Sequence, residues 1–164
     1  MKVIVCDAGP IIHLYEAKVL KLLKKAGSVY IPDYVYREAV NEIDLARSWP
    51  NWLQIIQLTN PEKEEAKFWA KIGDFHYGES EAFVLARKMN ADWLLTDDAA
   101  ARFFASLSGI EVHGSLGLVL WNAAQRYIKR DEAEKALTNL KNSSLWLSTA
   151  VYSEARQALQ DMGL

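Results

Sequence analysis

The chain has 164 residues, 51% of them hydrophobic, and a formal net charge of −2 at pH 7. This length favours one domain with a sizeable buried core, and no apolar run reaches the roughly 18 residues of a membrane span, so we expect no membrane segment. The single cysteine, Cys6, excludes an internal disulfide and favours a cytoplasmic protein. Because the net charge is small, a nucleic-acid partner would need a local basic patch.

Strands alternate with helices along most of the chain. The first predicted strand, Lys2–Cys6, is a continuous apolar run, which is typical of a strand buried on both faces. The other predicted strands are Ser28–Ile31, Trp52–Leu58, Trp93–Thr96 and Ile110–His113. The predicted helices are Ile11–Glu16, Val19–Lys25, Tyr34–Ala46, Asn60–Ile72, Glu79–Met89, Ala99–Leu107, Ser115–Ile128, Asp131–Leu140 and Thr149–Asp161. This alternation predicts an α/β fold with a parallel sheet covered by helices on both faces.

Aspartates follow two of the predicted strands. Asp7 comes directly after the first strand, and Asp97 and Asp98 follow the strand that begins at Trp93. In an open α/β sheet, ligands bind in the crevice at the carboxyl ends of the strands. Acids crowded into a partly dry site are unfavourable unless a cation neutralises them. The pattern therefore predicts a divalent-metal site and, with it, phosphate chemistry.

Glutamates on two predicted helices extend this acidic set. Glu38 lies on the helix after the second strand, and Glu79 and Glu81 open the helix before the Trp93 strand. Carboxylate oxygens suit Mg²⁺ or Mn²⁺, which can activate water and stabilise the oxygens of a phosphoryl displacement. If Glu79 and Glu81 are both helical, they lie about 200° apart around the axis, so we expect only one of them to reach a given ion.

Each acid except one also has a structural interpretation. Glu79 or Glu81 could complement the helix dipole, and Glu38 could be a solvated surface residue. One of the two neighbouring aspartates, Asp97 or Asp98, is expected to cap the helix that begins near Ala99. Asp7, between a buried strand and a Gly-Pro pair, has no evident structural role.

The order of these motifs resembles the PIN-domain superfamily, in particular its VapC-like toxin ribonucleases. The resemblance is carried by Val3–Leu14, Ile31–Val40, Gly78–Ala86 and Leu94–Arg102, and two further segments, His113–Leu120 and Leu145–Tyr152, look like an uncharacterised PIN subgroup. It implies a three-layer α/β/α domain with a central parallel sheet and extra C-terminal helices. Residues 1–128 would form the PIN-like nuclease domain, and residues 129–164 a helical extension packed on it.

By motif position, the resemblance assigns the catalytic acids. They would be Asp7, Glu38, Glu81 and Asp98, while Glu79 and Asp97 match nearly as well and complete the set of candidate metal ligands. Many family members carry Ser or Thr at one of the two positions after the first acid. This chain has Ala8 and Gly9 there, so that hydroxyl contact is either absent or supplied elsewhere.

The function that the resemblance implies is a Mg²⁺- or Mn²⁺-dependent endoribonuclease. Metal-activated water would hydrolyse RNA phosphodiesters, and the protein would be a cytoplasmic homodimer and the toxin of a toxin–antitoxin pair, with an antitoxin protein as partner. The alternative is a PIN-fold module without catalysis that binds RNA or a protein.

Other polar and aromatic residues have weaker functional interpretations. His13, His76 and His113 share no metal-ligand spacing, so we expect core or surface roles. Arg102 could steady a phosphate or pair with Asp98, and Trp146 could pack the C-terminal helices onto the domain or onto a partner. Two basic clusters could contact RNA phosphates but are expected to be solvated helix faces: Lys18, Lys21, Lys24 and Lys25, and Arg126, Lys129 and Arg130.

Overall fold

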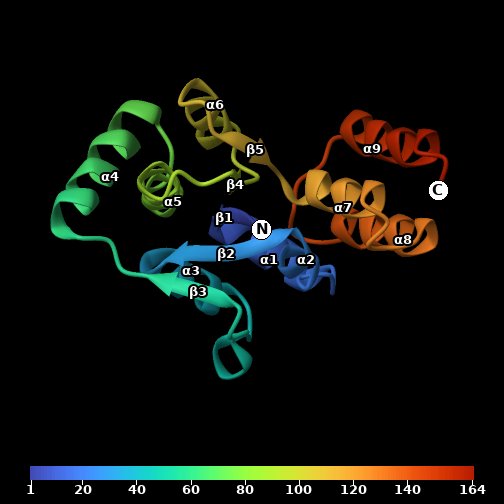
Figure 1. Ribbon diagram of the computed structural model, residues 1–164, viewed down its shortest axis with the longest axis horizontal. Helices are drawn as coiled ribbons and strands as arrows, with labels where there is room; N and C mark the ends of the chain where they lie inside the picture. The colour runs from blue at the N-terminus through green and yellow to red at the C-terminus, as the bar shows by residue number, and fades with distance from the viewer.

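The structure is a computed structural model that describes all 164 residues (Figure 1). Its strands are β1 (Lys2–Cys6), β2 (Gly27–Pro32), β3 (Leu53–Ile56), β4 (Trp93–Leu95) and β5 (Glu111–His113). Its α-helices are α1 (Ala8–Glu16), α2 (Leu22–Ala26), α3 (Asp33–Glu42), α4 (Asn60–Gly73), α5 (Tyr77–Lys88), α6 (Ala99–Leu107), α7 (Ser115–Ala124), α8 (Arg130–Lys141) and α9 (Thr149–Asp161), and a short 3₁₀ helix covers Ala46–Ser48. No helix combines the length and the apolarity needed to cross a membrane.

The five strands form one parallel sheet in the order β3-β2-β1-β4-β5. The chain builds outward from β1 to β3, crosses back, and then adds β4 and β5 on the other side of β1. Strand order therefore reverses between β1 and β4, where Val5 pairs with Leu94. In doubly wound sheets, the crevice at the carboxyl ends of such a strand pair is the usual ligand site.

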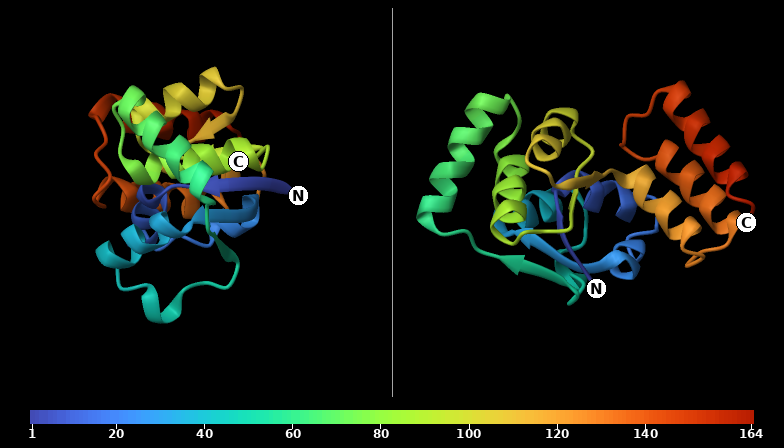
Figure 2. Two further views of the ribbon diagram at one scale, coloured as in Figure 1. Left: turned by 90° about the vertical axis from the view of Figure 1, so that its left-hand side faces the viewer. Right: turned by 45° about the horizontal axis from the view of Figure 1, so that its top comes forward.

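Helices cover both faces of the sheet, which confirms the predicted three-layer α/β/α architecture. Helices α1, α2 and α3 pack together with α7 on one face, and α4, α5 and α6 lie on the other. Helices α8 and α9 pack on α7, and Figure 2 shows these three as a group on the side of the molecule opposite α4. Leu137, Leu140 and Leu159 of this group belong to the same hydrophobic core as the strands.

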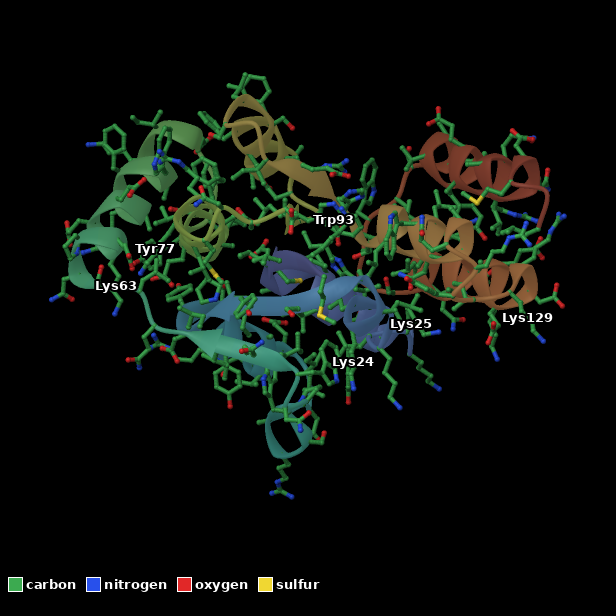
Figure 3. The ribbon with its side chains drawn as sticks, in the orientation of Figure 1. Lys24, Lys25, Lys63, Tyr77, Trp93 and Lys129 are labelled. Carbon is green, nitrogen blue, oxygen red and sulfur yellow. The ribbon has the colours of Figure 1, made fainter.

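The central strands are buried as their apolar sequences predict. Ile4, Val5 and Cys6 have no exposed surface, and Trp93 is 1% exposed inside the molecule (Figure 3). Cys6 is therefore a small core residue. Burial of both faces fixes the positions of the strand ends, because a shift in register would move a polar residue at one end of the strand into the core.

Two helices end earlier than their sequence patterns predict. Helix α3 stops at Glu42, because the chain becomes extended at Ile43 (φ −132°, ψ 147°) and buries both Ile43 and Leu45. Helix α7 stops at Ala124, and Arg126 adopts a left-handed conformation (φ 59°) that ends the helix. Both predictions extended the helices by about one turn, because apolar residues beyond each end continue the helical spacing.

Lys24 and Lys25, the two lysines of the first basic cluster that lie on α2, are at the opposite end of the strands from the strand-end acids. Helix α2 leads directly into the amino end of β2, and its Lys24 and Lys25 are labelled in Figure 3. Lys25 Nζ donates to the carbonyl of Tyr127 at 2.6 Å, which ties α2 to the end of α7. These two lysines therefore contribute no positive charge to the acidic edge.

Candidate functional site

Acidic side chains gather in a cleft at the carboxyl ends of β1 and β4. The two ends are joined directly, because the backbone N–H of Asp7 donates to the carbonyl of Leu95 at 2.9 Å. The cleft has a volume of about 460 Å³. We call it the acidic cleft, and its lining residues are Asp7, Ala8, Gly9, His13, Glu38, His76, Glu79, Asp97, Asp98, Ser144, Leu145 and Trp146.

Asp7 lies at the base of this cleft and is only 4% exposed. Burial, together with the negative charges of Glu79 and Glu38, raises the pKa of its carboxyl group to about 8. The backbone N–H of Ala8 and the hydroxyl of Thr96 act in the opposite direction, and the Thr96 hydroxyl donates to Asp7 Oδ2 at 3.3 Å. A hydroxyl contact to Asp7 thus exists, and it comes from the end of β4 rather than from positions 8 or 9.

Glu79 and Glu38 approach Asp7 from α5 and α3. Burial and the neighbouring charge of Asp98 raise the pKa of Glu79, while one of its oxygens accepts a hydrogen bond from the backbone N–H of His76 at 2.8 Å. Burial and the charge of Glu79 likewise raise the pKa of Glu38. The Glu38 carboxylate lies directly against Gly78, so a Cβ at that position would collide with it.

The two neighbouring aspartates have different partners. Asp98 caps α6, accepting a hydrogen bond from the N–H of Ala101 at 2.7 Å, which confirms the prediction that one of the pair is a helix cap. Asp97 accepts hydrogen bonds from the N–H and the hydroxyl of Ser115 at 2.7 and 2.6 Å, and its Oδ2 lies 2.7 Å from His13 Nδ1. Asp97 thereby joins the end of β4 to the start of α7 and to α1.

The structure places Glu79 and Glu81 differently. Glu79 lines the acidic cleft, whereas Glu81 is 3% exposed and does not line it. Burial and the neighbouring carboxyl group of Glu81 raise the pKa of Tyr77. The charge of Glu81 contributes less to the raised pKa of Glu38 than that of Glu79 does. Both glutamates are helical, so they point in different directions as their spacing predicts.

Two groups of cleft residues were not predicted from the sequence. His13 and His76 both line the cleft, and His13 is held there by Asp97. A signal for His13 existed, since it lies less than two turns along the helix that Asp7 opens. Ser144, Leu145 and Trp146 come from the connector between α8 and α9, and no local pattern relates that segment to β1.

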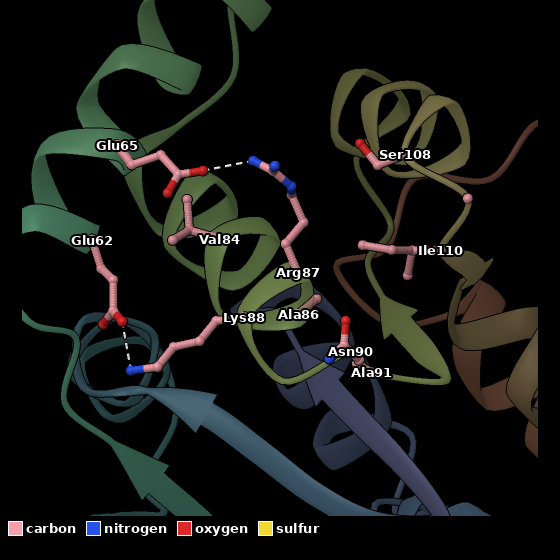
Figure 4. A pocket seen from close by; sticks show the side chains of 11 residues that line it. Glu62, Glu65, Val84, Ala86, Arg87, Lys88, Asn90, Ala91, Ser108 and Ile110 are labelled. Carbon is pink, nitrogen blue, oxygen red and sulfur yellow. Dashed lines mark hydrogen bonds and ion pairs between the residues drawn. The ribbon is translucent and has the colours of Figure 1, made fainter.

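No lysine or arginine lines the acidic cleft. A second cavity, drawn in Figure 4 at the other end of α5, provides a contrast. There each acid faces a base: Glu62 lies 2.5 Å from Lys88, and Glu65 lies 2.6 Å from Arg87. By contrast, no acid of the cleft pairs with a lysine or an arginine, and the one ion pair there joins Asp97 to His13.

The donor set of the cleft fits a hard divalent cation. Asp7, Glu38, Glu79 and Asp98 offer carboxylate oxygens, the ligands that Mg²⁺ and Mn²⁺ prefer. In the structure, no three acidic, histidine or cysteine side chains lie close enough together to form a metal-binding group. Burial first, and then repulsion between the like charges, raises the pKa values of Asp7, Glu38 and Glu79.

Comparison with known proteins identifies a family over almost the whole chain. The family model DUF3368, described as a PIN domain, matches residues 3–161. The match includes β1, the acidic cleft and helices α8 and α9. Among curated proteins, none matches the chain significantly.

Proposed function

The chain belongs to the DUF3368 family of PIN domains, and from that membership and its acidic cleft we propose that it is a Mg²⁺- or Mn²⁺-dependent endoribonuclease. PIN domains are generally metal-dependent nucleases, so the fold itself is of a nuclease type. The proposed substrate is RNA, whose phosphodiester bonds would be hydrolysed at the carboxyl ends of β1 and β4.

The observation that carries this proposal is the environment of Asp7. Its carboxyl group is 4% exposed, has Glu79 and Glu38 as charged neighbours, and faces no lysine or arginine. Such a group destabilises a folded protein, and strongly perturbed acids in clefts are typical of functional sites. A bound divalent cation would remove this penalty by neutralising several carboxylates at once.

We assign separate roles to the acids of the cleft. Asp7, Glu38, Glu79 and Asp98 would hold the cation, which when bound supplies an activated water and stabilises the phosphoryl oxygens. We assign Glu79 as a ligand because it lines the cleft. Glu81 is buried and does not line the cleft, so it would not contact the cation.

The remaining polar residues would keep these acids in position. Thr96 holds Asp7 with its hydroxyl and receives the N–H of Asp98 at 3.2 Å, so one side chain spaces the two acids. Asp97 fixes the start of α7 and orients His13 on the cleft wall. These contacts are what would preorganise the site.

The experiment that tests the proposal compares the wild type with Asp7→Asn. The purified wild-type protein should bind Mn²⁺ in a calorimetric titration and cleave a structured RNA in its presence, and Asp7→Asn should lose both properties. If the protein cleaves no RNA with Mn²⁺ present and Asp7→Asn leaves Mn²⁺ binding unchanged, the nuclease proposal fails.

The separation of the carboxylates favours the second candidate, a PIN-fold module that binds RNA or protein without catalysis, because no metal-binding group is formed. The two candidates differ in the same experiment. A binding module would retain RNA affinity in Asp7→Asn and show no Mn²⁺-dependent cleavage with either protein.

The toxin role, the antitoxin partner and the homodimer remain parts of the proposal. A toxin should arrest growth when expressed alone, Asp7→Asn should not, and a co-expressed short neighbouring gene product should restore growth. A homodimer would bury the exposed apolar side chains of α4 and α6, which are Phe68, Ile72, Phe103 and Leu107. Light scattering of the purified protein gives its oligomeric state directly.

A further inference from the structure

Trp146 is an exposed aromatic side chain that the acidic cleft does not explain. It is 83% exposed, more than any other large hydrophobic residue except Met1 at the start of the chain. An indole ring left in water forgoes the burial that stabilises most tryptophans. A ring held in this way beside a candidate active site is therefore a candidate binding surface.

The connector that carries Trp146 is fixed at both ends. The N–H and the hydroxyl of Ser144 both donate to Glu16 Oε2 at 2.8 Å, and Leu145 N–H donates to Ser143 Oγ at 3.2 Å. On the other side of the ring, Ser148 caps α9 by accepting from the N–H of Val151 at 3.1 Å. Trp146 is thus presented from an ordered connector, which in Figure 1 runs along the side of the α7–α9 group that faces the sheet.

Trp146 stands between two adjacent hollows. One is the acidic cleft, and the other is a groove of about 690 Å³ between α9 and the region of α6, β5 and α7. Asp97, Leu145 and Trp146 line both. We call the second hollow the apolar groove, since its walls include Leu116, Leu120, Leu147, Val151 and Ala155. A chain passing from one hollow to the other would cross the indole ring.

Arg102 is the one lysine or arginine in the lining of either hollow. Its guanidinium forms no ion pair. It lies close to Gly114, since a Cβ added to that glycine would be 3.5 Å from Arg102 Nη1 and 2.8 Å from Asp97 Oδ1. Arg102 follows Asp98 by one turn of α6. An unpaired guanidinium beside an acidic site is suited to bind a phosphate.

From these contacts we infer a nucleotide subsite: one unpaired base of the RNA stacks on Trp146, and Arg102 binds a phosphate next to it. The inference rests on the proposed function, because it places the scissile phosphate in the acidic cleft. Stacking needs an exposed base face, so the substrate is single-stranded RNA or an unpaired loop rather than a duplex. Because every base has such a face, the subsite selects strandedness and not sequence.

The test measures binding in the Asp7→Asn background, where the RNA is not cut. A short single-stranded RNA is compared with versions that carry one abasic nucleotide at successive positions. At one position, the abasic change should weaken binding about 5- to 150-fold, since stacking on an aromatic side chain is worth about 1–3 kcal/mol. Adding Trp146→Ala should weaken binding of the intact RNA by a similar factor and abolish the effect of the abasic change.

Three further variants sharpen the experiment. Trp146→Phe keeps a stacking face and should recover much of the affinity, whereas Tyr127→Ala, which removes a 48% exposed aromatic ring outside both hollows, should bind like its parent. Arg102→Gln should weaken binding of the intact RNA and of every abasic RNA by the same factor. It should also reduce the dependence of RNA affinity on salt concentration by the amount expected for about one phosphate contact.

The inference is overturned if Trp146→Ala binds intact RNA as its parent does, or if it weakens intact and abasic RNAs equally at every position. Either result would mean that no base stacks on the indole ring of Trp146. The apolar groove would then be a candidate binding site for a protein segment instead. Cleavage assays on the chain with Asp7 intact separate the two proposals. If the protein cleaves RNA but Trp146→Ala does not change RNA affinity, the subsite alone is overturned. If the protein cleaves no RNA but an abasic nucleotide at one position weakens binding, the subsite is supported and the nuclease proposal is overturned.

Discussion

The hydroxyl of Thr96 donates to Asp7 Oδ2 at 3.3 Å, which links the first residue after β4 to the first residue after β1. The same hydroxyl oxygen accepts the N–H of Asp98 at 3.2 Å. Thr96 is 1% exposed, so this arrangement is part of the core and not of a mobile surface. A buried carboxyl group is thereby held at the strand ends by neutral donors alone, the Thr96 hydroxyl and the backbone N–H of Ala8, so its ionisation state becomes sensitive to pH and to cations.

The stability of the metal-free protein should fall as the pH rises from about 4 to about 8. Asp7 has a pKa of about 8 when folded, against 3.8 for an ordinary aspartate. Across this window the folded state retains a proton that the unfolded state has lost, so the free energy of unfolding decreases by about 1.4 kcal/mol per pH unit. Urea unfolding in EDTA at several pH values measures the slope, and Glu38 and Glu79 should add to it.

Asp7→Asn is the control for this pH dependence. The variant cannot ionise at position 7, so it should be more stable than the wild type at pH 8 in EDTA, by a few kcal/mol on the same linkage argument. Saturating Mn²⁺ should raise the melting temperature of the wild type and leave that of Asp7→Asn nearly unchanged. Equal pH slopes for the two proteins would mean that Asp7 is not the titrating group.

Glu79→Gln and Glu81→Gln should separate the two candidates for the third acid. We expect Glu79→Gln to reduce cleavage by about 100- to 1,000-fold, the range found when one electrostatic group of an active site is removed. Glu81→Gln keeps the size of a buried side chain outside the cleft, so cleavage should remain within a few-fold of the wild type. Glu81→Ala should instead lose about 2–5 kcal/mol of stability, because truncation of this buried side chain leaves a cavity.

Cleavage rates of the two glutamine variants, measured with Mn²⁺ at saturation, decide the assignment. If Glu81→Gln abolishes cleavage while Glu79→Gln does not, Glu81 is the functional acid, as its position in the family motif suggests.

The sequence predicted those structural features that depend on residues close together along the chain. Strand β1 and helices α6 and α9 have the predicted bounds, since an apolar run and a helical spacing of apolar residues are both local patterns. The pairing of His13 with Asp97 joins positions 84 residues apart, and the Ser144–Glu16 contact joins positions 128 residues apart. Such contacts follow from how α1, α7 and α8 pack, so no single segment encodes them. The C-terminal wall of the cleft was therefore missed.

Asp97→Asn should destabilise the protein, whereas Asp98→Asn should not. Asp97 accepts two hydrogen bonds from Ser115 and lies 2.7 Å from His13 Nδ1, and an amide cannot replace both oxygens. Loss of a hydrogen bond to a charged group corresponds to about 1.5–3 kcal/mol of stability. Asparagine caps helices as well as aspartate does, so Asp98→Asn should change stability by less than about 0.5 kcal/mol and still reduce Mn²⁺ affinity.

Ser115→Ala is the matched control for the Asp97 prediction. It removes the hydroxyl that donates to Asp97 at 2.6 Å without changing any charge. It should reproduce part of the stability loss in thermal denaturation and leave Mn²⁺ affinity close to that of the wild type. A large loss of Mn²⁺ affinity in Asp97→Asn, with unchanged stability, would instead identify Asp97 as a metal ligand.

We expect a glycine to be required at position 78 because the Glu38 carboxylate lies against it, and not because of the backbone conformation of residue 78. A Cβ at residue 78 would collide with Glu38 Oε2, whereas a Cβ at Gly117 would meet only ordinary contacts, the nearest being His113 Nδ1 at 3.6 Å. Both glycines are helical, and alanine in place of a helical glycine stabilises a protein by up to about 1 kcal/mol. Gly117→Ala should show that gain and leave Mn²⁺-dependent cleavage unchanged.

Gly78→Ala should lose cleavage and Mn²⁺ affinity, because it displaces the Glu38 carboxylate from the cleft wall. In a Glu38→Ala background the collision is absent, so the same substitution should stabilise the protein as Gly117→Ala does. Urea unfolding of the four proteins in the Gly78–Glu38 cycle gives the coupling free energy between the two positions. If Gly78→Ala stabilises both backgrounds equally and retains full cleavage, the Glu38 carboxylate does not lie against α5 in the active protein, and its assignment as a ligand is wrong.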